Sequence, residues 1–449
     1  MRNTSNLILA EKSVPRYTSY PTAPHFSDKV NGAAAKAWLS ELPSKASLSL
    51  YLHIPFCSSI CTYCGCNTKA IRREEPLDAY TQTLMREMEL LSKSTKARRV
   101  TDIHWGGGTP SLLGPKRLIT LHNKLRDCFD LSGEIEHAIE LDPRTVDAEL
   151  VAALAEIGIT RASLGVQDFN PHVQEAIGRL QPFEVVANAV HLLRSVGIHA
   201  INLDLMYGLP YQTIEDVLNT AEQALTLNPS RLAIFGYAHV PWFKVHQRLI
   251  DLASLPGVAE RLAQANAACD YFVKHGFQAI GLDHFARDHD PMAKAARAGT
   301  LRRNFQGYTT DTADTLLPLG ASSIGYMPQG YVQNAPDVAG WRRAIEAEEL
   351  PIVKGIALST EDRARADVIE RLMCDFEVDF GAIAHAYLGD EAAFDDALDE
   401  LVSLAKDGLL DLKGRTIRIH EDGRPFVRLA ASAFDTYFKA SAARHSMAV

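Results

Sequence analysis

The sequence lacks the features of a membrane-spanning, secreted or nucleic-acid-binding protein. No apolar run approaches the ~20 residues that a membrane helix needs. The N-terminal segment contains only a short apolar run, Leu7 to Ala10, which is too short for the core of a signal peptide. Basic residues form no block beyond pairs such as Arg72–Arg73, and the net charge is −9. A general basic surface for nucleic acid is therefore disfavoured, and we expect a cytoplasmic protein that binds neither membrane nor nucleic acid.

Cysteine is scarce, with seven residues in a chain of 449, yet four of the seven fall within residues 53–66. Cys57, Cys61 and Cys64 have the spacing C-x3-C-x2-C, and Cys66 follows them. Thiolates suit iron–sulfur clusters, zinc or copper, and no second cysteine pair, as in many structural zinc sites, appears downstream. Three thiolates on a four-iron cube would leave one iron open to bind and reduce a ligand. A zinc site with Cys66 as fourth ligand and a redox disulfide are the alternatives.

Short apolar strands recur along the first two thirds of the chain, each followed by a loop and a helix-length stretch. A length of 449 residues, with 47% hydrophobic and 22% charged residues, is that of a globular protein with two or three domains. Strands that alternate with helices indicate βαβ units and a parallel sheet. We predict strands at residues 47–54, 101–108, 137–143, 161–167, 201–210, 232–238 and 278–285.

These strands alternate apolar and polar residues, whereas a parallel strand buried on both faces is nearly all apolar. The polar face holds Tyr51 and His53 in the first strand, Glu140 in the third, Gln167 in the fourth and Asp204 in the fifth. A polar face of this kind lines a lumen that holds a polar ligand, with the chemistry at the carboxyl ends of the strands. We therefore predict an α/β fold with a partial (βα)6-type, TIM-like barrel.

Three regions are expected: an N-terminal arm over residues 1–46, a catalytic barrel domain with an extension over residues 47–350, and a mostly helical, winged-helix-like domain over residues 351–449. The arm either caps the active site or simply covers the surface. Composition predicts irregular loops over residues 286–350. Local signals predict helices near Gly32–Ser40, from Asn170–Pro171 past Arg179, from Thr360 to Cys374 and from Asp390 to about Asp407, and a hairpin over residues 409–425.

The cysteine spacing, with Tyr63 just before the third cysteine, resembles the cluster loop of the radical S-adenosylmethionine (SAM) superfamily. The resemblance implies a [4Fe–4S] cluster held by Cys57, Cys61 and Cys64. It also implies that SAM chelates the open iron and is cleaved to a 5′-deoxyadenosyl radical.

The glycine-rich segment WGGGTP follows the second strand. Because glycine has no side chain, the backbone of this segment can approach a ligand closely. We interpret Gly107, Gly108 and Thr109 as gripping the methionine end of SAM, and Glu140 as accepting hydrogen bonds from its ammonium or ribose. A plain strand-to-helix turn and a structural ion pair are the respective alternatives.

Longer motifs narrow the resemblance: HIPFC-x3-C-x-YCGCN, HWGGGTP, IELDPR, LGVQDFN, LDLMYGLP, DHFA, RNFQGYTT and the arm's RYTSYPTAP. Together they resemble the oxygen-independent coproporphyrinogen III oxidases over nearly the whole chain. The resemblance implies oxidative decarboxylation of two propionates of coproporphyrinogen III to vinyl groups in haem biosynthesis. It further implies two bound SAM molecules and a monomer, and leaves the electron donor and acceptor unidentified.

The same resemblance assigns site residues. Contacts of the first SAM fall on Tyr51, Gly107 and Glu140. Contacts of the second SAM fall on Tyr63, Gly108, Thr109, Gln167, Arg179, Asp204, Ala238 and Ile324, and the segment around it includes Phe305 and Gln306. Cys66 matches a cysteine that lies beside the cluster without being a ligand. We expect Tyr51, His53 and Cys66 to take part in catalysis.

Two questions stay open at this point. Arg16 and either Arg302 or Arg303 are candidates to pair with the substrate's carboxylates, and solvated surface arginines are the alternative. A related haem-carrying chaperone and a radical SAM enzyme that opens the haem ring are the rival functions. The chaperone generally lacks the Cys66 continuation, the RYTSYP arm and the NFQGY segment, all of which are present here.

Overall fold

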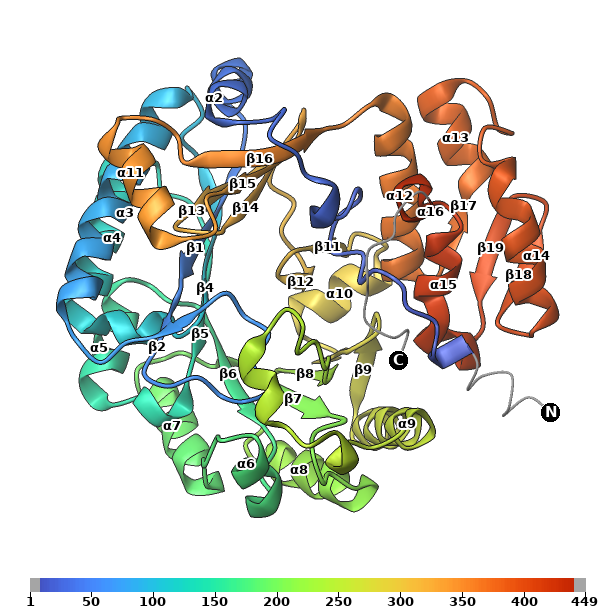
Figure 1. The fold of residues 1–449 in the computed structure, drawn as a ribbon, viewed down its shortest axis with the longest axis horizontal. Coiled ribbons are helices and arrows are strands. Elements are labelled where there is room, and N and C mark those ends of the chain that lie inside the picture. The colour runs from blue at the N-terminus through green and yellow to red at the C-terminus, as the bar shows by residue number, and fades with distance from the viewer. Residues whose placement is uncertain (1–8, 440–449) are drawn as a thin grey trace.

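A curved, largely parallel sheet organises the computed structural model, which describes residues 9–439 (Figure 1). Six parallel strands lie side by side in chain order, which confirms the predicted partial (βα)6 barrel. They are β1 (Leu48–Ile54), β4 (Val100–Gly107), β5 (Glu136–Leu141), β6 (Arg161–Gln167), β7 (Ala200–Tyr207) and β8 (Arg231–Gly236).

Helices cover the outer face of this sheet, as the outer ring of coils in Figure 1 shows. The strands turn their apolar face toward these helices, and Leu48, Leu50, Leu52 and Ile54 of β1 are completely buried there. A capping box at Thr213 begins α8. The covering helices are α3 (Glu75–Ser94), α4 (Gly114–Cys128), α5 (Ala148–Glu156), α7 (Phe183–Ser195), α8 (Ile214–Thr226) and α9 (Val258–Lys274).

The seventh predicted strand is wrong, because two antiparallel strands, β9 (Phe277–Ile280) and β10 (His284–Arg287), stand in its place. The chain reverses between them at Gly281, whose φ is +57°. A Cβ there would lie 1.9 Å from the ring of Tyr308, so only glycine fits this turn.

The region over residues 286–350 is more regular than composition predicts. β13 (Thr315–Leu319) pairs with β1 in parallel and begins a four-stranded extension of the sheet, whereas β11 (Arg302–Asn304) and β12 (Gly307–Thr309) form a separate hairpin. The strands are only three to six residues long, too short for a clear periodic signal. The remaining elements here are α10 (Pro291–Arg297), β14 (Ile324–Met327), β15 (Gly330–Asn334), α11 (Val338–Glu346) and β16 (Ile352–Ala357).

The helix predicted to contain Arg179 is shorter than expected. α6 (Pro171–Ala176) begins at Pro171 as predicted but ends before Gly178, whose φ is +65°. Arg179 therefore lies in the turn beyond the helix, where it points back to the strand ends.

The C-terminal elements form a second buried cluster around Phe380, Phe394 and Phe434. The hairpin prediction is confirmed by β18 (Leu410–Lys413) and β19 (Thr416–Ile419). The helix predicted from Asp390 is wrong at its start, because Asp390 caps only a turn and α14 begins at Leu398. The other elements are α12 (Thr360–Asp375), β17 (Glu377–Asp379), α13 (Phe380–Leu388), α14 (Leu398–Lys406), α15 (Val427–Ser432) and α16 (Thr436–Lys439).

The N-terminal arm joins the two parts. Its helix α2 (Gly32–Glu41) lies on the barrel side, whereas Leu9, Val14, Tyr17 and Tyr20 pack in the C-terminal cluster (Figure 1). The predicted division into three regions stays a prediction, and residues 1–8 and 440–449 at the outer ends lie outside the described residues. Over residues 9–439, no helix combines the length and apolar character needed to cross a membrane.

Two side chains of α3 form hydrogen bonds that hold the loop after β13 against the end of β1. Tyr80 donates to the carbonyl of His53 at 2.7 Å and accepts from Ala321 N, while Glu87 accepts from Gly320 N at 2.7 Å. Glu87 is completely buried, and burial raises its pKa to about 8 despite these hydrogen bonds.

Replacing Glu87 with glutamine should remove a pH dependence of stability. The folded pKa lies above the unfolded value, so deprotonation of the unfolded chain destabilises the fold as pH rises. The Tm of the wild type should therefore fall relative to that of Glu87→Gln between about pH 5 and about pH 8 in scanning calorimetry.

Glu89 on the same helix is the matched control, because its hydrogen bond with Lys124 lowers its pKa. Both its folded and unfolded forms are ionised across this range, so Glu89→Gln should show no such pH-dependent difference. Parallel Tm curves for the wild type and Glu87→Gln would contradict the raised pKa.

Candidate active site

The cysteine loop leaves the sheet at the carboxyl end of β1, where the sequence places the chemistry. It runs from β2 (Phe56–Cys57) to β3 (Lys69–Ala70), which pair with each other. Gly108 N donates to Ile54 O and Thr109 N to Phe56 O, both at 2.8 Å. The glycine-rich segment after β4 is thus bonded directly to the start of the cysteine loop.

Two of the thiols are surrounded by hydrogen-bond donors. Cys57 Sγ lies 3.2 Å from the hydroxyl of Thr68 and accepts from that of Thr109 at 3.4 Å. Cys61 is buried, and Arg179 Nη1 donates to its sulfur at 3.7 Å. These groups favour negative charge on the sulfurs, but burial outweighs them at Cys57 and raises the pKa of its thiol.

Cys64 and Cys66 are adjacent but differ chemically. Hydrogen bonding with Cys66, opposed by burial, lowers the pKa of Cys64 to about 6, whereas the same interaction and burial raise the pKa of Cys66. Cys64 is therefore the sulfur of this pair that is ready to bind metal as a thiolate.

A segment after β8 supports the loop from outside, and sequence reasoning missed it. Lys244 Nζ donates to Cys66 O at 2.8 Å, His246 Nε2 lies 2.7 Å from Cys64 O, and Gln247 Nε2 donates to Tyr63 O at 2.8 Å. The signal is absent from the sequence because about 180 residues separate the partners.

This donor set fits an iron–sulfur cluster, because three soft thiol ligands share one loop with hydroxyl and guanidinium donors around them. Within residues 9–439, no three His, Cys, Asp or Glu side chains are arranged to hold a single metal ion. A four-iron cluster differs from a single ion here, because each of its thiolates binds its own iron. All seven cysteines are free thiols.

The polar strand faces meet inside the barrel, as the period-two pattern predicts. A cavity of about 240 Å³ is lined by Tyr51, His53 and Glu140 together with Phe305, Gln306, Leu316, Ser322, Ser323 and Ile324. The structure thus brings the predicted residues of β1 and β5 together with those after residue 300.

Glu140 occupies the centre of one wall. It accepts from Gly107 N at 3.0 Å, and its other oxygen lies 3.1 Å from His104 Nε2. Burial raises the pKa of Glu140, but these partners outweigh burial and hold it below its usual value. The carboxylate is therefore charged at neutral pH.

Tyr51 and His53 form a neutral pair beside it, with Tyr51 Oη 3.0 Å from His53 Nδ1. His53 Nε2 lies 3.1 Å from the carbonyl of Asn67, which accepts only, so Nε2 carries the proton and Nδ1 accepts from Tyr51. Burial lowers the pKa of His53 and raises that of Tyr51, which keeps both groups neutral.

A second polar group lies on β6 and β7. Asp204 accepts from Ser163 at 2.7 Å and from Asn202 at 2.8 Å, and burial raises its pKa. Arg179 donates to Gly165 O at 2.7 Å, and the amide of Gln167 also approaches Gly165. The guanidinium also pairs with Asp142 at 3.4 Å, so it links this group to Cys61.

Ala238 and Arg302, two of the candidates from the sequence, have partners within the protein. Ala238 contributes its carbonyl, which accepts from Gln247, the residue that also bonds to Tyr63 O. Arg302 pairs with Glu370 of α12 at 2.8 Å, whereas Arg303 turns to the arm. Of the two alternatives, Arg303 is the one near the barrel mouth.

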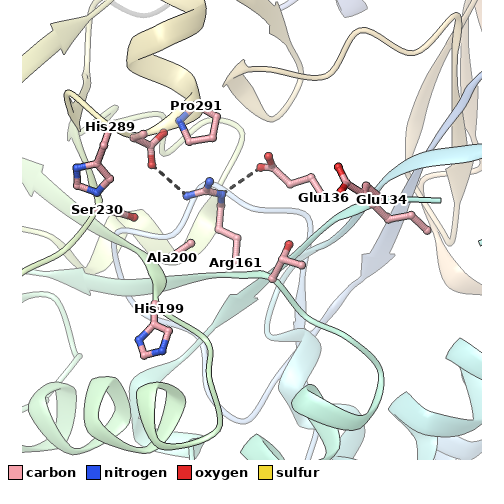
Figure 2. Close-up of a pocket in the computed structure, with 11 residues that line it drawn as sticks. Glu134, Glu136, Arg161, His199, Ala200, Ser230, His289 and Pro291 are labelled. Carbon is pink, nitrogen blue, oxygen red and sulfur yellow. Dashed lines mark hydrogen bonds and ion pairs between the residues drawn. The ribbon is translucent and has the colours of Figure 1, made fainter. Parts of the chain in front are cut away.

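Another cavity, of about 520 Å³, lies at the amino ends of the strands and is shown in Figure 2. Arg161 pairs there with Glu136 at 3.0 Å and with Asp290 at 3.6 Å, and Arg231 pairs with Asp290 at 2.7 Å. The charges are paired with one another, which is typical of the stabilising end of a barrel.

A partial barrel with three cysteines on a loop at the carboxyl end of β1 and a polar lumen defines a radical SAM protein. The sequence model of the radical SAM superfamily matches residues 51–224.

Relatives extend the match to the whole chain. It is 46% identical to an oxygen-independent coproporphyrinogen III oxidase of Bradyrhizobium diazoefficiens over 100% of both chains, and 41% identical to one of Paracoccus denitrificans over 98% of both. The solved structure of the coproporphyrinogen III oxidase of Escherichia coli superposes with a TM-score of 0.90 at 36% identity, covering 95% of this chain and 100% of that one. The chain belongs to the family of oxygen-independent coproporphyrinogen III oxidases.

Gly108 should not tolerate a side chain. A Cβ there would lie 2.5 Å from both Phe56 O and Thr68 Oγ1, and forcing an atom into so tight a contact costs about 1–3 kcal/mol. Gly108→Ala should lower the Tm of the metal-free chain and its capacity to take up iron and sulfide. Gly133, whose Cβ position is open, is the control; equal losses in Gly108→Ala and Gly133→Ala would contradict the close approach.

Proposed function

We propose that this chain catalyses its family's reaction, the oxidative decarboxylation of two propionates of coproporphyrinogen III to give protoporphyrinogen IX. The observation that carries the proposal is the convergence of three cysteine sulfurs, a glycine-rich strand end and a polar lumen at one end of a barrel. This arrangement occurs in a chain that matches its relatives from end to end.

Cys57, Cys61 and Cys64 would hold the cluster in this proposal, with Cys66 beside it. When bound, the cluster and SAM supply a 5′-deoxyadenosyl radical, which is reactive enough to take hydrogen from an unactivated propionate carbon without oxygen. Thr109 donates to Cys57, and the hydroxyl of Thr68 lies 3.2 Å from the same sulfur, so both would help to hold its negative charge.

The ionised carboxylate of Glu140 would bind the cationic cofactor SAM. Glu140 is ionised between two neutral neighbours, Tyr51 and His53. Its carboxylate would therefore suit an ammonium group or ribose hydroxyls bound beside Gly107. The His53 imidazole orients the Tyr51 phenol, so this pair would position a ligand without adding charge.

A second SAM would contact the other predicted residues. They are Tyr63, Gly108, Thr109, Gln167, Arg179, Asp204, Ala238 and Ile324, with Phe305 and Gln306 around it. Support comes from the contacts of Arg179 with Cys61 and from the common cavity of Ile324, Phe305 and Gln306. A monomeric state and a reducing, cytoplasmic location belong to the same proposal, the latter because an exposed cluster is sensitive to oxygen.

Anaerobic reconstitution tests the function directly. The protein, given iron, sulfide, a strong reductant, SAM, coproporphyrinogen III and an acceptor for the electron that leaves with each carbon dioxide, should release two molecules of carbon dioxide for each protoporphyrinogen IX and should form 5′-deoxyadenosine. Stoichiometric haem binding without carbon dioxide would favour the chaperone, and consumption of haem would favour the ring-opening enzyme.

The ligand count gives a separate prediction. Serine in place of Cys57, Cys61 or Cys64 should abolish the visible absorption of the reconstituted cluster, because each removes one of three protein ligands. Cys66→Ser is the matched control and should keep the cluster, since Cys66 lies outside the C-x3-C-x2-C spacing and is not a ligand in this proposal. Cluster loss in Cys66→Ser, or its retention in any of the other three, would overturn the assignment.

A further inference from the structure

Four arginines from distant parts of the chain meet at the carboxyl ends of β7 and β8. Arg16 of the N-terminal arm donates to Gly236 O, the last residue of β8, at 3.5 Å. Arg303 of β11 donates to the carbonyls of Tyr17 and Arg16, both at 3.2 Å. Arg428 of α15 donates to the arm at Val14 O at 3.4 Å.

Arg261 of α9 completes the group. Its guanidinium approaches the ends of both strands, because a Cβ on Gly208 would lie 2.8 Å from Nη1 and one on Gly236 would lie 3.3 Å from Nη2. Arg261 is only 8% exposed, and its Nε has no hydrogen-bond partner within the described residues. A buried guanidinium nitrogen without an acceptor is costly unless a ligand supplies one.

The like charges act on one another. Burial first, and then Arg16, lower the pKa of Arg261, and the same two causes lower that of Arg428 to about 10. Asp283 is the acidic group that faces them, and it also shares a hydrogen bond with His284. Glu370 also reaches the group, where it accepts from the backbone N of Arg303 at 3.0 Å. Four guanidinium groups against these two carboxylates form a local excess of positive charge in a chain whose net charge is −9.

The arginine group adjoins the cavity that holds the predicted catalytic residues. Arg303 is the middle residue of β11, and Phe305 and Gln306 at the turn of the same β11–β12 hairpin line the cavity with Tyr51 and Glu140. The hairpin therefore connects Arg303, and through it the arginine group, with the wall of this cavity.

We propose that Arg16, Arg261, Arg303 and Arg428 bind the propionate carboxylates that coproporphyrinogen III retains through both turnovers. This inference rests on the proposed function. Guanidinium groups pair with carboxylates through charge-assisted, often bidentate hydrogen bonds. A carboxylate held in this way is stabilised as an anion, and loss of carbon dioxide would remove that charge, so the arginines suit the propionates that do not react. The reacting propionate then faces the Tyr51 and Glu140 side.

Single substitutions test the site. Arg16→Gln and Arg261→Gln should each raise the KM for coproporphyrinogen III, and the Kd for coproporphyrin III measured by equilibrium dialysis of the reconstituted enzyme, roughly tenfold or more. Increasing salt should weaken binding to the wild type more steeply than binding to either variant, because each variant has lost one ionic contact.

Arg302→Gln is the matched control, since Arg302 is the chain neighbour of Arg303 but pairs with Glu370. It should bind coproporphyrin III as the wild type does. Substrate-independent formation of 5′-deoxyadenosine with dithionite should be equal in all variants, which shows that the fold and the cluster site are intact.

The outcomes separate this inference from the proposed function. A wild type that decarboxylates coproporphyrinogen III, with unchanged KM, Kd and salt dependence in Arg16→Gln and Arg261→Gln, overturns the arginine site alone. An equal loss of binding in Arg302→Gln also overturns it. A wild type that neither binds coproporphyrin III nor releases carbon dioxide overturns the proposed function and this inference with it.

Discussion

The structure depends on a sheet whose two faces are both covered but differ in polarity. Helices pack on the apolar face, where the side chains of β1 are completely buried, and the other face keeps Glu140, Ser163 and Asp204. Polar groups inside a fold need partners, and here many find them across strands, as Ser163 does with Asp204. The hydrogen bonds that satisfy the lumen therefore also fix the side chains that face a ligand.

Much of the fold and of the candidate site could be predicted from the sequence, because the sequence signals that specify them are local. The period of two along each strand places Tyr51, Glu140 and Asp204 on one face whatever surrounds the strand. The spacing of Cys57, Cys61 and Cys64 is likewise contained in one short loop. The fold class and the strand residues of the cavity lining, Tyr51, His53 and Glu140, followed from such patterns, whereas Leu316, Ser322 and Ser323 were not predicted.

The features that could not be predicted depend on contacts between distant segments or on single turns. Gly178, with its positive φ, ends α6 early and redirects Arg179 toward Cys61, which a capping signal at the start of the helix cannot show. Gly281 makes two strands from what reads as one. Arg261 carries no signal of its own, because its role arises only when the arm and the ends of β7 and β8 come together.

The distribution of charge in the lumen matches the two kinds of ligand that the reaction brings together. SAM carries a sulfonium and an ammonium, and the acidic groups Glu140 and Asp204 lie toward the middle strands. Coproporphyrinogen III carries four carboxylates, and Arg261 and Arg428 lie where the arm meets the barrel. In the proposed assignments, each region would repel the wrong ligand as well as attract the right one. Because the arm supplies Arg16 and carbonyls that orient Arg303 and Arg428, the positive region is complete only when the arm is docked. The packing of Tyr17 and Tyr20 against the C-terminal elements would thereby help to orient the substrate.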